Sequence, residues 1–213
     1  MKTDDLIAML ASDPAPVARG APSKRLALGL LAGAVLAALA MQLTLGVRPD
    51  IAQAILQPGF WGKLIFPALL AGAGFVTLAL LARPGMRARA GEVAMLLLVA
   101  GLWAMAVSAW AGAAPPDRAA MVWGTTWRAC TLNIVLLSVP VFAATVLALR
   151  QLAPTRLAEA GACAGALSGA AGAAIYAFHC PETGLPFMAV WYVAAIALVA
   201  GLGAVLGRRL LRW

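Results

Sequence analysis

The chain has few charged residues for its length. Only 11% of its 213 residues are Asp, Glu, Lys or Arg, whereas 63% are hydrophobic. A soluble domain carries about a quarter charged residues, so the polar surface of this chain is too small to keep it dissolved in water. The composition excludes an ordinary soluble domain and indicates a protein of the lipid bilayer.

The sequence also lacks the residues of known catalytic motifs. It has a single histidine, His179, and it contains no H-E-x-x-H, no phosphate-binding loop and no G-x-S-x-G motif. Its three cysteines form no C-x-x-C pair of the kind that thiol redox enzymes use. We therefore expect a protein that is not an enzyme and that has no resident cofactor.

Ionisable residues are almost absent from the middle of the apolar runs. Lys63, Glu92 and Glu159 lie near run ends, where Lys63 can extend its ammonium to the interface and the acids can face water. A transporter needs a polar path through its bundle. A small-molecule or ion transporter, or an exporter subunit, is therefore the weaker alternative.

What the chain does have is six long apolar runs. Each approaches the roughly 20 residues that an α-helix needs to cross about 30 Å of hydrocarbon. The runs are 26–45, 61–82, 92–112, 131–149, 157–178 and 187–206. We expect an all-α polytopic membrane bundle of six transmembrane helices over residues 26–206. A cytoplasmic N-terminal segment, residues 1–25, and a basic C-terminal tail, residues 207–213, would flank it.

The basic residues predict the orientation of this bundle. Most of the 16 Lys and Arg residues lie at the two termini and in alternate loops. This set comprises Lys2, Arg19, Lys24, Arg25, Arg83, Arg87, Arg89, Arg150, Arg156, Arg208, Arg209 and Arg212. Because cytoplasmic loops are enriched in Lys and Arg, both termini are predicted to be cytoplasmic. The same distribution, at run ends rather than in a patch, argues against direct binding of nucleic acid despite the net charge of +8.

The N-terminal segment can form a short amphipathic helix. Thr3 is the expected N-cap, Asp4 and Asp5 would lie in the first turn, and Leu6, Ile7 and Leu10 would form a narrow apolar face. A helix of about nine residues is marginal alone in water, so it could order on a partner that offers a groove. A frayed tail and a segment lying on the membrane surface remain the alternatives.

Two cysteines, Cys130 and Cys180, fall on the extracytoplasmic side of the predicted topology. Thiols in that compartment can form a disulfide, or they can supply soft ligands to a metal together with His179 and either Met188 or Glu182. The alternative is that both are small buried residues that never meet. Cys163 lies in the middle of a run and is interpreted as lipid-facing or core-facing filler.

Small residues recur at four-residue spacing in three of the runs. The sets are Gly29 and Gly33; Gly161, Gly165 and Gly169; and Gly203 and Gly207. This spacing places glycines on one helix face, where backbones can approach closely. Packing within the chain is favoured over a dimerisation surface.

Several short motifs occur in order along the chain. They are Met1-Lys2-Thr3-Asp4-Asp5-Leu6-Ile7, Gly62-Lys63, Trp127-Arg128-Ala129-Cys130, Ser138-Val139-Pro140, Ala153-Pro154-Thr155, the stretch 161–172, Tyr176-Ala177-Phe178-His179-Cys180, Trp191-Tyr192 and Arg209-Leu210-Leu211-Arg212-Trp213. In their order and spacing these motifs resemble those of the NrsF family, and the resemblance covers nearly the whole chain.

The resemblance implies a six-span protein of the bacterial inner membrane that acts as an anti-sigma factor. Its cytoplasmic N-terminus, with Asp4, Asp5, Leu6, Ile7 and Leu10, would sequester an extracytoplasmic-function sigma factor. Cys130 and Cys180 would sense a stress such as a heavy metal or an oxidant and release that factor. A transient heavy-metal ion at Cys130, Cys180 and His179 would be the only metal involved.

Overall fold

The computed structural model describes residues 2–12 and 20–212, which form helices and turns with no strand among them. Six long helices make up the bundle: α2 (Ala21–Thr44), α4 (Pro58–Leu81), α5 (Arg89–Gly112), α7 (Trp127–Arg150), α8 (Leu157–Tyr176) and α10 (Val193–Leu210). The short helices are α1 (Thr3–Ala11), α3 (Ile51–Ala54), η1 (Pro115–Asp117), α6 (Arg118–Trp123), α9 (Leu185–Phe187) and η2 (Met188–Tyr192). The expected all-α class is confirmed.

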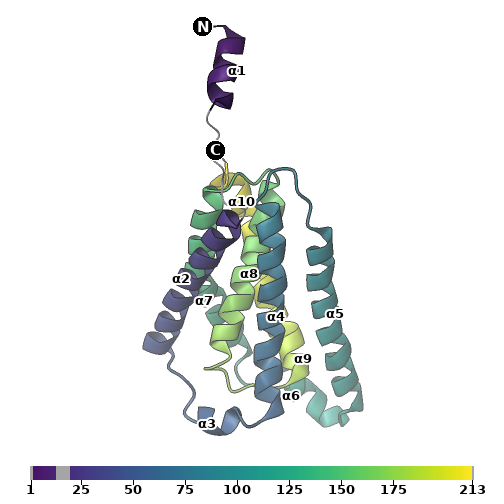
Figure 1. Cartoon of the computed structure of the whole chain (residues 1–213). Helices are drawn as coiled ribbons and strands as arrows, with labels where there is room; N and C mark the ends of the chain where they lie inside the picture. Colours follow the sequence, from purple (N-terminus) through teal and green to yellow (C-terminus); the bar gives the residue numbers. More distant parts are fainter. Residues whose placement is uncertain (1, 13–19, 213) are drawn as a thin grey trace.

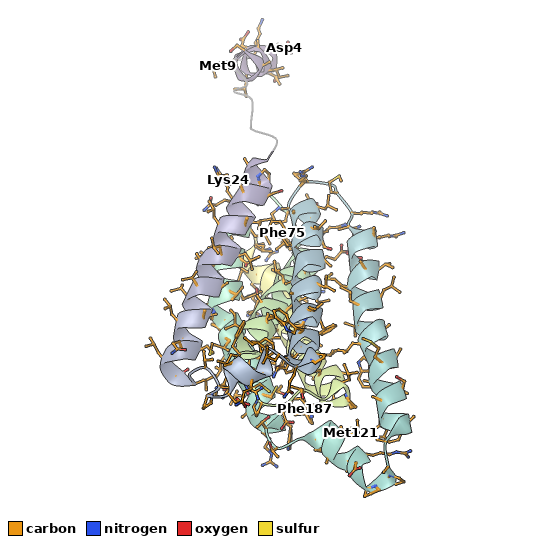
Figure 2. All side chains as sticks on the ribbon, turned by 60° about the horizontal axis from the view of Figure 1, so that its bottom comes forward. Asp4, Met9, Lys24, Phe75, Met121 and Phe187 are labelled. Atoms are coloured by element: carbon orange, nitrogen blue, oxygen red, sulfur yellow. The ribbon has the colours of Figure 1, made fainter. Side chains whose placement is uncertain are left out.

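Successive long helices run in opposite directions, so the bundle has two ends (Figure 1). We call one the basic end, because α2 begins there, α10 ends there, and its connections and helix ends carry Lys24, Arg83, Arg87, Arg150, Arg156 and Arg208. The other is the thiol end, which holds α3, α6 and the 177–184 loop between α8 and α9. In Figure 2 the thiol end comes forward, with Met121 and Phe187 there and Lys24 at the far side.

Helix α8 lies at the centre of the bundle and packs against α10, α7, α4 and α2. Glycines allow the closest of these contacts. A Cβ at Gly161 or Gly165 would overlap a carbonyl oxygen of α10, and a Cβ at Gly33 would come within 2.6 Å of the Val141 Cα in α7. The glycine spacing therefore serves packing within the chain, as expected.

Five segments of the described chain are long and apolar enough to cross a membrane, instead of the six expected. They are Ala21–Thr44, Pro58–Leu81, Arg89–Gly112, Pro115–Arg150 and Leu185–Leu210. The long helix that is not among them is α8, in which alanine, glycine and serine dominate and Glu159 lies in the first turn. Those residues have low hydropathy, but they suit a helix that is enclosed by its neighbours and buries most of its surface.

Several of the long helices begin before the apolar runs that predicted them. Helix α2 starts at Ala21, within the expected N-terminal segment, and has a proline in its first turn, where the missing N–H is tolerated. Helix α7 starts at Trp127 rather than near Thr131, after Gly124 adopts a positive φ of 52°. This earlier start places Cys130 within the first turn of α7.

Candidate functional site

Cys130 and Cys180 meet at the thiol end of the bundle. Cys130 lies on α7 and Cys180 in the 177–184 loop, and the antiparallel packing of α7 and α8 brings them to one level. Their thiols lie close enough to influence each other, both residues are 0% exposed in one buried cluster, and both thiols are free. The two residues are therefore a pair, and the interpretation that they never meet is wrong.

Lys63 reaches this pair from α4. We expected its ammonium to extend to the interface, but Lys63 is 0% exposed. Its Nζ donates hydrogen bonds to the carbonyl oxygen of Cys180 and, over 2.8 Å, to that of Glu182. The expectation fails because the 177–184 loop covers the end of α4 and supplies the acceptors that water would otherwise provide.

Arg48 approaches the same loop from the connection between α2 and α3. Its guanidinium bonds both carboxylate oxygens of Asp50, at 2.7 and 2.6 Å, and its Nη1 donates to the Cys180 carbonyl oxygen over 3.3 Å. The hydrogen bonds from Arg48 lower the pKa of the Asp50 carboxyl. The Arg48 backbone N–H also donates to the carbonyl oxygen of Phe178.

Glu182 ties the 177–184 loop to the segment that leads into α7. Its Oε1 accepts hydrogen bonds from the backbone N–H of Thr125 over 2.8 Å and from the Thr125 hydroxyl over 2.9 Å. Cys130 follows five positions after Thr125. The two segments that carry the thiols are therefore joined directly.

A phenol completes the surroundings of the thiols. Tyr192 is fully buried at the end of the π-helical turn η2. Its hydroxyl lies near Cys180 and has no hydrogen-bond partner among the described residues. Single π-turns within helices often occur at functional sites. The neighbouring Cys130 thiol lowers the pKa of the Cys180 thiol, and the charge of Lys63 acts in the same direction against the effect of burial.

The described residues do not bring three metal-ligating side chains together. No group of three or more His, Cys, Asp or Glu residues within 2–12 and 20–212 is arranged to hold a metal ion. The Nδ1 of His179 lies 2.9 Å from the carbonyl oxygen of Gly46, and the Glu182 carboxylate is bonded to Thr125. Met188 is buried in the same apolar cluster as both thiols. The site is thus a thiol pair with its neighbouring cation rather than a preformed metal cage.

Cys163 lies away from this pair, on α8. It is buried, and its thiol donates to the carbonyl oxygen of Gly74 on α4 over 3.3 Å. Of the two orientations expected for it, the core-facing one is correct.

The residues expected to bind a partner lie on α1. Asp4, Asp5, Leu6 and Ile7 are all exposed, and the two acids occupy the first turn as expected. The N-cap is Lys2 rather than Thr3, and its backbone N–H donates to the Asp5 carboxylate over 3.2 Å. The side chain of Leu10 lies outside the described residues.

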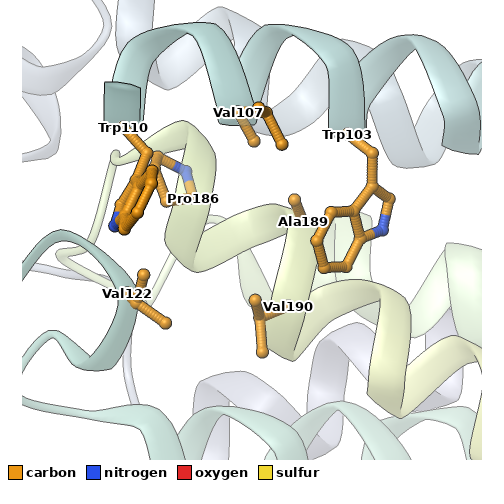
Figure 3. A pocket seen from close by; sticks show the side chains of 8 residues that line it. Trp103, Val107, Trp110, Val122, Pro186, Ala189 and Val190 are labelled. Carbon is orange, nitrogen blue, oxygen red and sulfur yellow. The ribbon is translucent and has the colours of Figure 1, made fainter. Parts of the chain in front are cut away.

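The cavities of the described bundle have mostly apolar walls. One of about 300 Å³ lies between α5, α6 and the α9–η2 segment and is lined by Trp103, Ala106, Val107, Trp110, Val122, Pro186, Ala189 and Val190 (Figure 3). Glu92 and Glu159 line a second cavity, of about 400 Å³. That cavity also borders Cys163 and four apolar residues, and Glu159 is paired with Arg156 at 2.6 Å. These cavities provide no continuous polar path of the kind that transport requires.

Comparisons with known proteins agree with the resemblance found in the sequence. The family described as negative regulator of sigma F, NrsF, matches residues 10–213. A probable anti-sigma-F factor NrsF of Azospira oryzae is 42% identical over 213 residues, which cover all of both chains. An anti-sigma-F factor NrsF of Caulobacter vibrioides is 40% identical over 215 residues, again covering both chains completely.

No solved structure matches the chain. The names of the two relatives describe regulators rather than enzymes, as the missing catalytic motifs predicted. A full-length match of this kind, together with the ordered motifs at both ends, establishes that the chain belongs to the NrsF family.

Proposed function

We propose that the chain is a membrane-bound anti-sigma factor of the bacterial inner membrane with both termini in the cytoplasm. It sequesters an extracytoplasmic-function sigma factor through its N-terminal segment and releases that factor when Cys130 and Cys180 are oxidised or bind a heavy metal. The observation that carries this proposal is the pairing of two buried thiols at the thiol end, in a chain whose relatives are named anti-sigma factors.

The distribution of charge supports this orientation. The basic end carries most of the arginines, and short basic loops favour the cytoplasm. The thiol end then faces the extracytoplasmic side, where disulfides persist. Helix α8 would cross the membrane as a sixth span, enclosed by the five apolar segments. With six spans, the start of α2 and the end of α10 lie on the same side of the membrane.

A signal at the thiols shifts the bundle between two states only if it interacts differently with each of them. Moving the equilibrium from 1:99 to 99:1 takes about 5.5 kcal/mol. Metal–thiolate coordination is strong enough to supply that difference, and a disulfide, at about 2–4 kcal/mol, supplies a large part of it. In this scheme the bundle connects chemistry at one end to α1 at the other.

Capture by α1 is tested with variants of its exposed aliphatic residues. Replacing Leu6 and Ile7 together with Asp removes the apolar face, and each side chain contributes about 1.5–3 kcal/mol when buried against a partner. We expect the affinity for the sigma factor to fall on the order of a hundredfold or more. A pull-down with the full-length chain first identifies the sigma factor. The measurement is then the fraction of that sigma factor that sediments with membranes containing each variant.

The control is Ser12→Ala, because Ser12 is exposed and follows the end of the same helix. This variant is expected to bind the sigma factor normally. If the double Asp variant also holds the sigma factor on membranes as the native chain does, capture by α1 is wrong.

A further inference from the structure

Lys63 is a buried cation without a carboxylate partner within the described residues. The ion pairs there are Arg48 with Asp50 and Arg156 with Glu159, and the Glu182 side chain faces Thr125 instead. The Lys63 ammonium is satisfied by backbone carbonyl oxygens alone. Burying a cation costs several kcal/mol, and hydrogen bonds to neutral carbonyl groups offset that cost only in part, so a Lys at this position is unfavourable for stability compared with an apolar residue.

The two carbonyl oxygens that Lys63 binds flank a single residue, Pro181. One ammonium that holds both carbonyls fixes the backbone turn between them, and with it the direction of the Cys180 side chain. The same turn carries Glu182, whose carboxylate holds Thr125 ahead of α7. Lys63 therefore links three parts of the molecule: α4, the 177–184 loop and the start of α7.

We propose that Lys63 is the positioning residue of the thiol pair, which holds the turn from Cys180 to Glu182 so that Cys180 faces Cys130. This inference rests on the proposed function of the pair, but it concerns the geometry of the pair alone. Arg48 adds a second, weaker hold on the Cys180 carbonyl. The charged and titratable groups around Cys180 are Lys63, Arg48, Cys130, Tyr176, Glu182 and Tyr192.

The consequence of this positioning is fast formation of a disulfide between the two residues. With diamide as the oxidant, both S–H bonds break and one S–S bond forms. The two electrons and two protons pass to the N=N bond of diamide, which becomes a hydrazine. The reaction needs the two sulfur atoms within bonding reach, and a misplacement of roughly 1 Å slows a reaction between positioned groups by about a hundredfold.

The test uses the purified full-length chain in detergent. The chain carries Cys163→Ser, so that Cys130 and Cys180 are the only cysteines that can react. Lys63→Met keeps the length of the side chain but removes the charge and the donors. We expect disulfide formation with diamide to slow by about tenfold to a hundredfold. We also expect Cys180, which is inaccessible in the native chain, to become open to a maleimide.

Two further variants separate positioning from general stability. Lys63→Arg keeps a charged donor and should restore most of the native rate. Lys24→Met removes an exposed lysine at the basic end and should change nothing. If Lys63→Met does not accumulate, Lys63→Gln takes its place, since its shorter amide cannot reach both carbonyls and should also slow the reaction.

A folded Lys63→Met or Lys63→Gln variant that forms the disulfide at the native rate overturns the proposal. A native chain that forms no disulfide with diamide overturns it too. Because this assay contains no sigma factor, its result is independent of release. A native pair that depends on Lys63 but does not control release would refute the proposed function and leave the role of Lys63 standing.

Discussion

Glu182 joins the two segments that carry the paired thiols, and its contribution can be measured. Glu182→Ala removes two charge-assisted hydrogen bonds to Thr125, which are worth about 1.5–3 kcal/mol each in a typical protein. We expect a lower unfolding temperature in detergent and faster alkylation of Cys130. Thermal melting and maleimide labelling of the Cys163→Ser background provide the two readouts.

The matched control is Glu159→Ala, which removes the same charge from an exposed pair with Arg156. Exposed ion pairs contribute about 0–1 kcal/mol, so this variant should melt nearly as the native chain does. Equal effects of the two substitutions would mean that Glu182 has no special role at the thiol end.

At this scale the sequence predicted that Cys130 and Cys180 lie at the same end of the bundle, but it did not predict their environment. Counting the apolar runs between Cys130 and Cys180 is enough to place both residues on the same side of the membrane. The burial of Lys63 was not predictable in the same way, because a lysine near the end of an apolar run usually extends to the interface. Only the fold of the 177–184 loop over α4 reveals two carbonyl acceptors there.

Helices α8 and α10 depend on glycine for their contact. A Cβ at Gly203 would overlap the Gly161 carbonyl oxygen and come within 3.1 Å of the Gly165 Cα. Gly203→Ala must therefore push the two backbones apart, and overpacking of this kind costs about 1–3 kcal/mol. We expect a lower melting temperature and a weaker response at the thiols, because α8 leads into the 177–184 loop.

Gly201 lies on the same helix with open space around it, so Gly201→Ala is the comparison. It should leave stability unchanged or raise it by about 0.5–1 kcal/mol, because alanine loses less backbone entropy in a helix. Thermal melting of both variants decides the matter. A Gly203→Ala variant as stable as Gly201→Ala would show that the α8–α10 contact tolerates separation.

At the level of elements, the apolar runs predicted the long helices well and their ends poorly. The ends depend on local chemistry, such as a proline in the first turn of α2 or the positive φ of Gly124 before α7. The low hydropathy of α8 shows a different limit. A helix covered by its neighbours is selected for small residues, so its composition stops resembling that of a membrane span.

The whole molecule has its reactive and basic groups at opposite ends. Two thiols and Lys63 gather at the thiol end, whereas most arginines lie at the basic end, where α2 begins. The sparse polar chemistry between the ends agrees with a connector rather than a transport path. With the proposed sidedness, a chemical change on the extracytoplasmic side of the inner membrane is converted into a change of binding in the cytoplasm.

In the proposed mechanism, the state of the thiol pair controls binding of the sigma factor at the other end of the bundle. The most direct measurement reconstitutes the full-length chain with its bound sigma factor in lipid nanodiscs and follows the bound fraction after addition of diamide or cadmium. The native chain and Cys163→Ser are expected to release the sigma factor, with an affinity at least about tenfold weaker, or 1.4 kcal/mol. The double variant Cys130→Ser with Cys180→Ser is expected to retain it. Retention by the native chain, or equal release from the double variant, would contradict the account.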